Sequence, residues 1–260
     1  MRIGIIGLGV VGGSLYKVLR AFHMDVKGYD ADPNRSKDKL KEIFQTDIVF
    51  LALPTPLSSE GRLNVTLLTE YLEKLEAIKY SGVVVIKSTL PVGYMKKARD
   101  CNLRILYNPE FAHHRIIIEE IVNPPYILCS GSERDVEEYR RVFYWIPVER
   151  YRVADDSTTE IAKLAMNAFA ATKISFVNEV ERICKVNGAD ERRVMEILRL
   201  DKRCGSEYAY PNRGPYDGSC LPKDIRELMN STPDSILLRA VEKVNKRIKK
   251  VTTMSKKERI

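Results

Sequence analysis

The 260-residue sequence predicts an α/β fold in which a parallel-sheet domain is followed by an all-helical domain. In the first 150 residues, short apolar strand candidates alternate with helical patterns. Such alternation is typical of a parallel sheet with helices on both faces. Beyond about residue 154 the strand patterns stop and longer helical patterns follow. We therefore expect a domain at 1–153, a helical domain at 154–250 and a basic tail at 251–260.

The predicted strands are short apolar runs, at 2–6, 25–29, 48–53, 83–87, 104–107 and 127–129. The helical patterns between them include 12–21, 66–78 and 134–143. In the second domain the predicted helices are 157–186, 190–199, one that opens at Pro222, and 233–251.

The helix predicted at 157–186 is unusually long and contains neither Gly nor Pro. Asp155, Asp156 and Ser157 are candidates for its N-cap, and Asn187-Gly188 is its stop signal. The last predicted helix carries apolar residues spaced by four and three, at 237, 241, 244, 248 and 251. This spacing indicates a seam that packs on the same or a partner subunit.

Composition places the chain among ordinary globular proteins, with 44% hydrophobic and 30% charged residues. No apolar run approaches membrane-spanning length, and the N-terminus reads as a first strand rather than a signal peptide. We expect a cytoplasmic protein without a membrane partner.

Five cysteines without metal-ligand or redox spacing make a disulfide scaffold unexpected. The adjacent His113 and His114 point in different directions and are joined by no further cluster, so no metal site is expected.

The net charge of +8 is concentrated at the C-terminal end of the chain. Residues 239–260 contain nine Lys or Arg and two Glu, so they account for +7 of it. A nucleic-acid surface spread over the body is therefore not expected. A solvated helix end is the favoured interpretation of this tail, and contact with an acidic partner or nucleic acid is the alternative.

A glycine fingerprint, Gly7-Leu8-Gly9-Val10-Val11-Gly12, directly follows the first strand and opens a helix. Gly7 permits the tight turn, Gly9 lets the backbone approach a pyrophosphate, and Gly12 allows close helix–strand packing. The helix start supplies N–H donors and a positive dipole. Asp30, at the end of the second strand, suits ribose hydroxyls and repels a 2′-phosphate, so a Rossmann-type domain with NAD is predicted. Arg35 nearby would soften that preference.

Two further constellations carry chemistry. Lys163 and Asn167 are four residues apart and share one helical face with Glu160, where an ammonium and an amide can stabilise an oxyanion. Cys220 lies just before a helix start and near Lys223, two features that favour a thiolate. Asp224, in the first helical turn, can approach the same place.

The sequence resembles the UDP-glucose and GDP-mannose (nucleotide-sugar 6-) dehydrogenase family over about residues 1–250. The pieces that carry the resemblance occur in the family's order. They are the glycine fingerprint, Leu53-Pro54-Thr55-Pro56, Lys87-Ser88-Thr89-Leu90-Pro91-Val92-Gly93, Asn108-Pro109-Glu110-Phe111, Glu160-x-x-Lys163-x-x-x-Asn167, Asp201-Lys202-Arg203 and Gly218-Ser219-Cys220-Leu221-Pro222-Lys223-Asp224.

The resemblance implies oxidation of a sugar C6 alcohol to the carboxylate with two NAD, through a thiohemiacetal and a thioester. Cys220 would be the nucleophile and Lys163, with Asn167, the oxyanion stabiliser. Asp224 would position water and assist proton transfer. The resemblance also implies that Glu110 and Thr89 position water for hydrolysis. The residues that it implies at the cofactor are Pro54, Thr55, Thr89 and Lys223. Those that it implies at the substrate are Glu110, Lys163, Asn167, Arg203 and Gly218.

UDP-glucose is the substrate expected from the family, because Phe111 favours the UDP-glucose and GDP-mannose branches. Arg203 is expected to reach the sugar, across a dimer interface in one reading. The family pairs through the helix at 157–186, so a homodimer is expected as well. Its usual product is a uronic acid for polysaccharide synthesis.

The sequence also departs from the family. The family continues into a third, nucleotide-binding domain, whereas this chain stops where the central domain closes. His114 stands where an acidic residue is usual, and Asp217 replaces a glycine before the cysteine. Two alternatives therefore stay open. One is a two-domain hydroxyacid dehydrogenase that uses Lys163 and Asn167 only. The other is an inactive NAD-binding protein or one half of a split enzyme.

Overall fold

A computed structural model describes residues 1–112, 116–205, 208, 210 and 213–257. The chain divides into two compact units. The first comprises Met1–Ser58 and Leu63–Lys163, and the second comprises Ser59–Arg62 and Leu164–Ile260. The domain boundary expected after residue 153 stays a prediction.

The first unit is built on a five-stranded parallel sheet with the order β2-β1-β3-β4-β5. Its strands are β1 (Arg2–Ile6), β2 (Asp25–Tyr29), β3 (Ile48–Leu51), β4 (Val83–Ile86) and β5 (Arg104–Tyr107). A separate parallel pair joins β6 (Ile127–Cys129) to β7 (Tyr151–Val153). The predicted parallel α/β class is confirmed. Two predicted strand ends were wrong, since β3 stops at Leu51 and β4 at Ile86, where the chain turns into loops.

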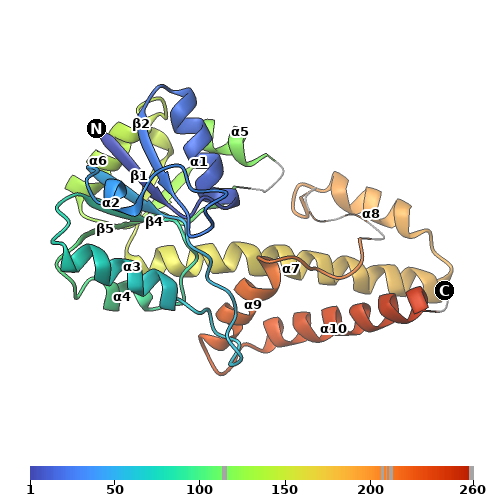
Figure 1. The fold of residues 1–260 in the computed structure, drawn as a ribbon. Helices are drawn as coiled ribbons and strands as arrows, with labels where there is room; N and C mark the ends of the chain where they lie inside the picture. Colours follow the sequence, from blue (N-terminus) through green and yellow to red (C-terminus); the bar gives the residue numbers. More distant parts are fainter. Residues whose placement is uncertain (113–115, 206–207, 209, 211–212, 258–260) are drawn as a thin grey trace. The chain divides into compact units, whose positions relative to one another are not determined.

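Helices cover both faces of this sheet (Figure 1). One face packs against α1 (Val10–Ala21), α5 (Ile117–Val122) and α6 (Glu133–Val142), and the other against α2 (Leu40–Ile43), α3 (Thr66–Ala77) and α4 (Tyr94–Ala98). Strand residues alternate between the two faces, as in Ile5 and Ile6, which are buried in different clusters. Each fully buried Ile or Val side chain contributes roughly 1.5–3 kcal/mol.

The sequence missed several short elements. Helices α2, α4 and α5 have only four to six residues, which is too short for a helical period to be visible. Strand β7 has three residues, two of them exposed, and so lacks an apolar run.

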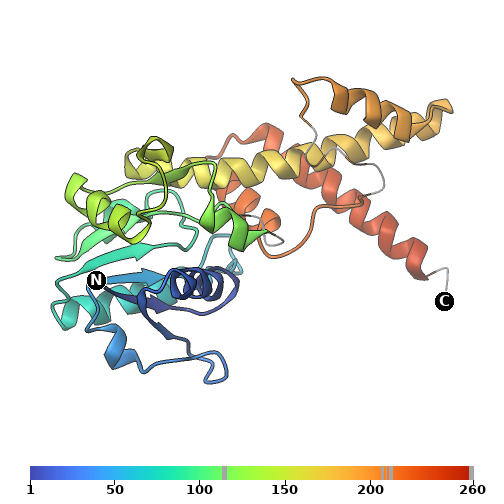
Figure 2. The ribbon, with the colours of Figure 1, turned by 90° about the horizontal axis from the view of Figure 1, so that it is seen from above.

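The regular elements of the second unit are the helices α7 (Asp156–Asn187), α8 (Glu191–Leu200), α9 (Leu221–Asn230) and α10 (Ile236–Lys257). The first residues of α7, up to Lys163, belong to the first unit. Asp155 caps α7 by accepting from the Thr158 N–H at 2.9 Å, and Gly188 follows its end with a φ of 66°. Ala168, Ala171 and Ile174 of α7 pack on α9 and α10. Helix α8 lies beside the C-terminal part of α7 (Figure 2), where Met195 packs on Val177.

The apolar seam predicted along the last helix is only partly buried. Val241 is in the core, whereas Leu237 and Val251 are 65% and 60% exposed. Helix α10 continues to Lys257, so part of the predicted basic tail is helical.

In the part of the chain that the structure describes, no helix combines the length and the apolar character needed to cross a membrane. All five cysteines lie in that part and are free thiols.

Candidate active site

The glycine turn between β1 and α1 has the geometry that its three glycines predict. Gly7 has a φ of +92°, and a Cβ on Gly12 would lie 1.9 Å from the Gly7 carbonyl oxygen. A Cβ on Gly9, by contrast, would meet no atom within 4 Å. Helix α1 begins at Val10 and has no side-chain cap among the described residues. Open space in front of uncapped N–H groups is what a pyrophosphate requires.

Asp30 lies directly beside this turn. Its carboxylate accepts from the Leu8 N–H at 2.7 Å and from the Arg35 guanidinium at 3.1 Å, and it is only 8% exposed. The sequence placed Asp30 near the turn, and the structure brings them together through the pairing of β1 with β2. These residues fit a dinucleotide, with Asp30 in reach of a ribose bound at the turn.

The loops that follow β3 and β4 are tied to each other by Ser88. Its hydroxyl accepts from the Leu53 N–H at 2.9 Å and donates to the Leu53 carbonyl at 2.7 Å. Thr55 is buried, Pro54 is exposed and Thr89 is half-buried. The carboxyl ends of neighbouring parallel strands thus present these residues at the edge where α/β proteins bind ligands.

Glu110 belongs to a polar network that the sequence did not reveal. Its Oε2 lies 3.1 Å from the Lys87 Nζ, and Lys87 also donates to the Asn108 Oδ1 at 2.7 Å. The Tyr139 hydroxyl donates to the same Asn108 oxygen at 2.7 Å. Lys87 is only 9% exposed. The one available signal was that Lys87 and Asn108 directly follow adjacent strands.

The surroundings of Glu110 hold it in the ionised form. Burial by itself raises the pKa of the Glu110 carboxyl, but the Lys87 ammonium and the Ala112 N–H outweigh burial, so that this pKa lies below its usual range. Lys163, which is 8% exposed, lies with its Nζ 5.3 Å from the centre of the Phe111 ring and also favours the carboxylate. Lys163 and Glu110 are therefore neighbours within the first unit.

Glu160 has a structural task. Its two oxygens accept from the Gly93 and Met95 N–H groups at 2.6 and 2.7 Å, at the start of α4. Burial raises the pKa of the Glu160 carboxyl, although these two N–H groups oppose the shift. The carboxylate thereby holds the loop that begins with Lys87-Ser88-Thr89.

Cys220 forms the N-terminal boundary of α9, as predicted. One turn later, the fully buried Asp224 accepts from the Asn167 side-chain amide at 2.5 Å and from the Lys223 Nζ at 2.6 Å. The sequence placed Lys223 near the thiol, whereas the structure pairs its ammonium with Asp224. Asn167, Lys223 and Asp224 thus form one hydrogen-bonded group at the start of the helix that carries Cys220.

Two asparagines hold the loop that leads to Cys220, and the sequence had not singled them out. The buried Asn245 side chain accepts from the Tyr216 N–H at 2.8 Å and donates to the Tyr216 carbonyl at 3.1 Å. Asn178 donates to the Gly214 carbonyl at 2.9 Å. Gly218 follows with a φ of +85°, a conformation that suits glycine.

The unusual Asp217 is turned outward, 78% exposed, with the Lys249 Nζ 3.4 Å from its carboxylate. The Gly218 N–H, and next the Lys249 ammonium, keep the pKa of the Asp217 carboxyl below its usual range. This carboxylate therefore has local partners that offset its charge.

Arg203 is 89% exposed and pairs with Asp201 at 2.5 Å. His113 and His114 lie outside the described residues. Within those residues, no group of three or more His, Cys, Asp or Glu side chains could hold a metal ion.

The glycine turn, Asp30 and the doubly covered parallel sheet define a protein of the dinucleotide-binding, Rossmann-type class. Comparison with known proteins makes this assignment narrower. Residues 33–146 match the NAD-binding domain of the UDP-glucose/GDP-mannose dehydrogenase family, and residues 157–247 match that family's central domain. The chain belongs to the UDP-glucose/GDP-mannose dehydrogenase family, and the predicted cofactor, NAD, is confirmed.

Individual relatives of the chain support the same family assignment. The chain is 34% identical over 220 residues to a UDP-glucose 6-dehydrogenase of Bacillus subtilis and 32% identical over 226 residues to one of Pseudomonas aeruginosa. Each match covers 79% of this chain and 50% or 49% of the relative. The chain therefore spans about half the length of these curated relatives. A solved UDP-glucose dehydrogenase structure from Pyrobaculum islandicum matches with a TM-score of 0.83 at 26% identity, covering 95% of this chain and 68% of that one.

Proposed function

We propose that the chain catalyses the NAD-dependent oxidation of the C6 alcohol of a nucleotide sugar, UDP-glucose, to the carboxylate. The two relatives described above are named for UDP-glucose, and this supports the choice of substrate. The single observation that carries the mechanism is the placement of Cys220 one turn before the Asn167–Asp224–Lys223 group.

In the proposed reaction the C6 alcohol first loses a hydride and a proton and becomes an aldehyde. The Cys220 thiolate then adds to the aldehyde carbon, and the resulting thiohemiacetal loses a second hydride to give a thioester. Water attacks the thioester, the carbon–sulfur bond breaks, and the acid and the Cys220 thiol are released. When bound, NAD accepts the hydride in each of the two oxidations.

The roles of the surrounding groups follow from their charges. The Lys163 ammonium stabilises the alkoxide and the later oxyanions, and Asn167 supplies a second donor. Glu110 is a carboxylate near neutral pH and serves as the base that orients water, with Thr89 beside it. Asp224 assists proton transfer at the start of α9. Gly7, Gly9, Gly12 and Asp30 would hold the cofactor at the turn between β1 and α1.

The test is a count of NADH formed per UDP-glucose consumed, for the natural chain and for Cys220→Ser. The matched control is Cys204→Ser, because Cys204 is an exposed free thiol of the same unit. We expect two NADH per sugar, loss of acid formation in Cys220→Ser, and full activity in Cys204→Ser.

If one NADH forms per turnover and Cys220→Ser does not change the rate, this proposal is refuted and the chemistry is that of a hydroxyacid dehydrogenase. Tight NAD binding without turnover on UDP-glucose would refute the proposed substrate. GDP-mannose would then be assayed, followed by a search for a partner chain that completes the enzyme.

We also propose that the protein is a homodimer that pairs through α7. Phe169, Phe176 and Ile183 lie seven residues apart along this helix and are 67%, 57% and 49% exposed. Apolar side chains repeated at this spacing on one helix face suit a helix–helix interface. The experiment is light scattering coupled to size exclusion. Phe169→Ser/Phe176→Ser should shift the protein to monomer, and the exposed Val148→Ser should not; a monomeric natural chain would overturn the proposal.

A further inference from the structure

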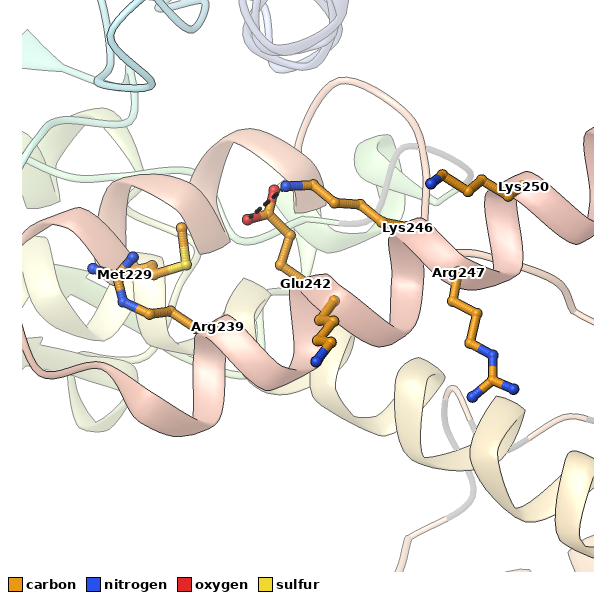
Figure 3. A pocket seen from close by; sticks show the side chains of 7 residues that line it. Met229, Arg239, Glu242, Lys246, Arg247 and Lys250 are labelled. Atoms are coloured by element: carbon orange, nitrogen blue, oxygen red, sulfur yellow. Dashed lines mark ion pairs between the residues drawn. The ribbon is translucent and has the colours of Figure 1, made fainter.

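A strongly cationic groove lies along α10, near the end of α9 and entirely within the second unit (Figure 3). Its volume is about 520 Å³. It is lined by Met229, Arg239, Glu242, Lys243, Lys246, Arg247 and Lys250. Five of these seven side chains are cations and one is a carboxylate. None of these side chains takes part in the proposed dehydrogenase reaction.

The cations lie within one face of the helix. Arg239, Lys243, Lys246 and Lys250 follow one another at steps of four, three and four residues. At 1.5 Å per residue this row extends about 16 Å along the helix axis. A ligand that meets the whole row must therefore be extended and must carry several negative charges.

The lone carboxylate of the groove is already neutralised. Glu242 is 12% exposed and lies 2.6 Å from the Arg226 Nε and 3.5 Å from the Lys246 Nζ. Among the residues that the structure describes, no carboxylate pairs with Lys243, Arg247 or Lys250. The groove therefore keeps a strong positive charge.

Such a row is unfavourable for the isolated helix, because like charges three and four residues apart repel each other. The helix dipole does not compensate for it, since most of the row lies well before the last turn, which ends at Lys257. An anionic ligand would remove this repulsion.

We propose that this groove binds an acidic segment of a partner protein. Two features favour a peptide over nucleic acid. Among the described residues that line the groove, none has an aromatic ring on which a base could stack. The Glu242 carboxylate can accept a hydrogen bond from a peptide N–H, a donor that a phosphodiester backbone does not have. Met229 at one end offers an apolar contact that a peptide side chain can use.

The experiment measures fluorescence anisotropy of a labelled glutamate–alanine peptide of about 16 residues. Lys243→Gln/Arg247→Gln/Lys250→Gln removes three charges from the groove. The matched control Lys96→Gln/Lys97→Gln/Lys185→Gln removes three exposed charges elsewhere. Because each exposed ion pair changes an equilibrium constant by roughly two- to fivefold, the groove variant should bind about tenfold or more weakly. The control variant should bind within about twofold of the natural chain.

Binding should also weaken steeply with salt, and a peptide with glutamine in place of glutamate should not bind. Equal losses in the two triple variants, or no binding of the acidic peptide to the natural chain, would overturn the proposal. A single-stranded oligonucleotide of equal charge that binds more tightly than the peptide would do so too. Circular dichroism of both variants should match that of the natural chain, so that weaker binding is not caused by loss of helix. None of these readouts depends on dehydrogenase activity.

Discussion

Replacing Lys87 by Met tests the polar network around Glu110. Lys87 is 9% exposed and holds the Glu110 carboxylate at 3.1 Å and the Asn108 oxygen at 2.7 Å. Removing one partner of a buried ion pair destabilises a protein by about 3–5 kcal/mol. Glu110 is 18% exposed and keeps its hydrogen bonds from the Phe111 and Ala112 N–H groups. We therefore expect Lys87→Met to lower the free energy of unfolding by about 2–3 kcal/mol at pH 8.

The assay is urea unfolding followed by the fluorescence of the single tryptophan, Trp145, which lies in the first unit. Lys87→Met, Glu110→Gln and the double variant form a cycle whose coupling energy should be about 1–2 kcal/mol. Tyr139→Phe removes only a hydroxyl that bonds to Asn108, so it should cost about 1 kcal/mol.

The pH dependence has a definite sign. In the natural chain the pKa of Glu110 is depressed, mainly by the Lys87 charge acting against burial, so its stabilising contribution is lost only as pH falls through that low pKa. Without Lys87, burial raises this pKa, and the carboxyl protonates on mild acidification. The difference in unfolding free energy between the natural chain and Lys87→Met should therefore become smaller from pH 8 to about pH 5. The same difference for Tyr139→Phe should stay constant. A coupling energy below about 0.5 kcal/mol, or a difference for Lys87→Met that is equal at both pH values, would refute the reasoning.

Four further substitutions test the rest of the site. Gly9→Ala should fold normally but bind NAD at least about tenfold more weakly by titration, because its Cβ occupies only ligand space. Gly12→Ala should instead lower the melting temperature, since its Cβ would lie 1.9 Å from a carbonyl oxygen. Asn245→Ala should lower the free energy of unfolding in urea by about 2 kcal/mol, because it removes two hydrogen bonds. Glu160→Ala should lower it by about 2–4 kcal/mol, because two N–H groups lose their acceptor. A loss below about 0.5 kcal/mol in either of the last two would show that water replaces the missing side chain.

The local patterns predicted most of the fold. All six predicted strands, which are the five of the main sheet and β6, were located within two residues of their ends, because short apolar runs are strong signals. The long helix α7 was located within one residue at each end, since its cap and its Asn-Gly stop are both local. Short α4 was missed because it is held by long-range contacts such as those of Glu160, and β7 was missed because it has no apolar run.

The sequence by itself determined the parallel sheet, the glycine turn beside Asp30, and Cys220 at the start of a helix. Periodicity, turn chemistry and capping operate over a few residues, so local patterns were sufficient to predict these features. Only the tertiary structure decided that Lys87 pairs with Glu110, that Lys223 pairs with Asp224, and that the cations of α10 line a groove together with Met229 of α9. Partners chosen through space depend on the packing of elements that lie far apart in the chain, and no local pattern records that choice.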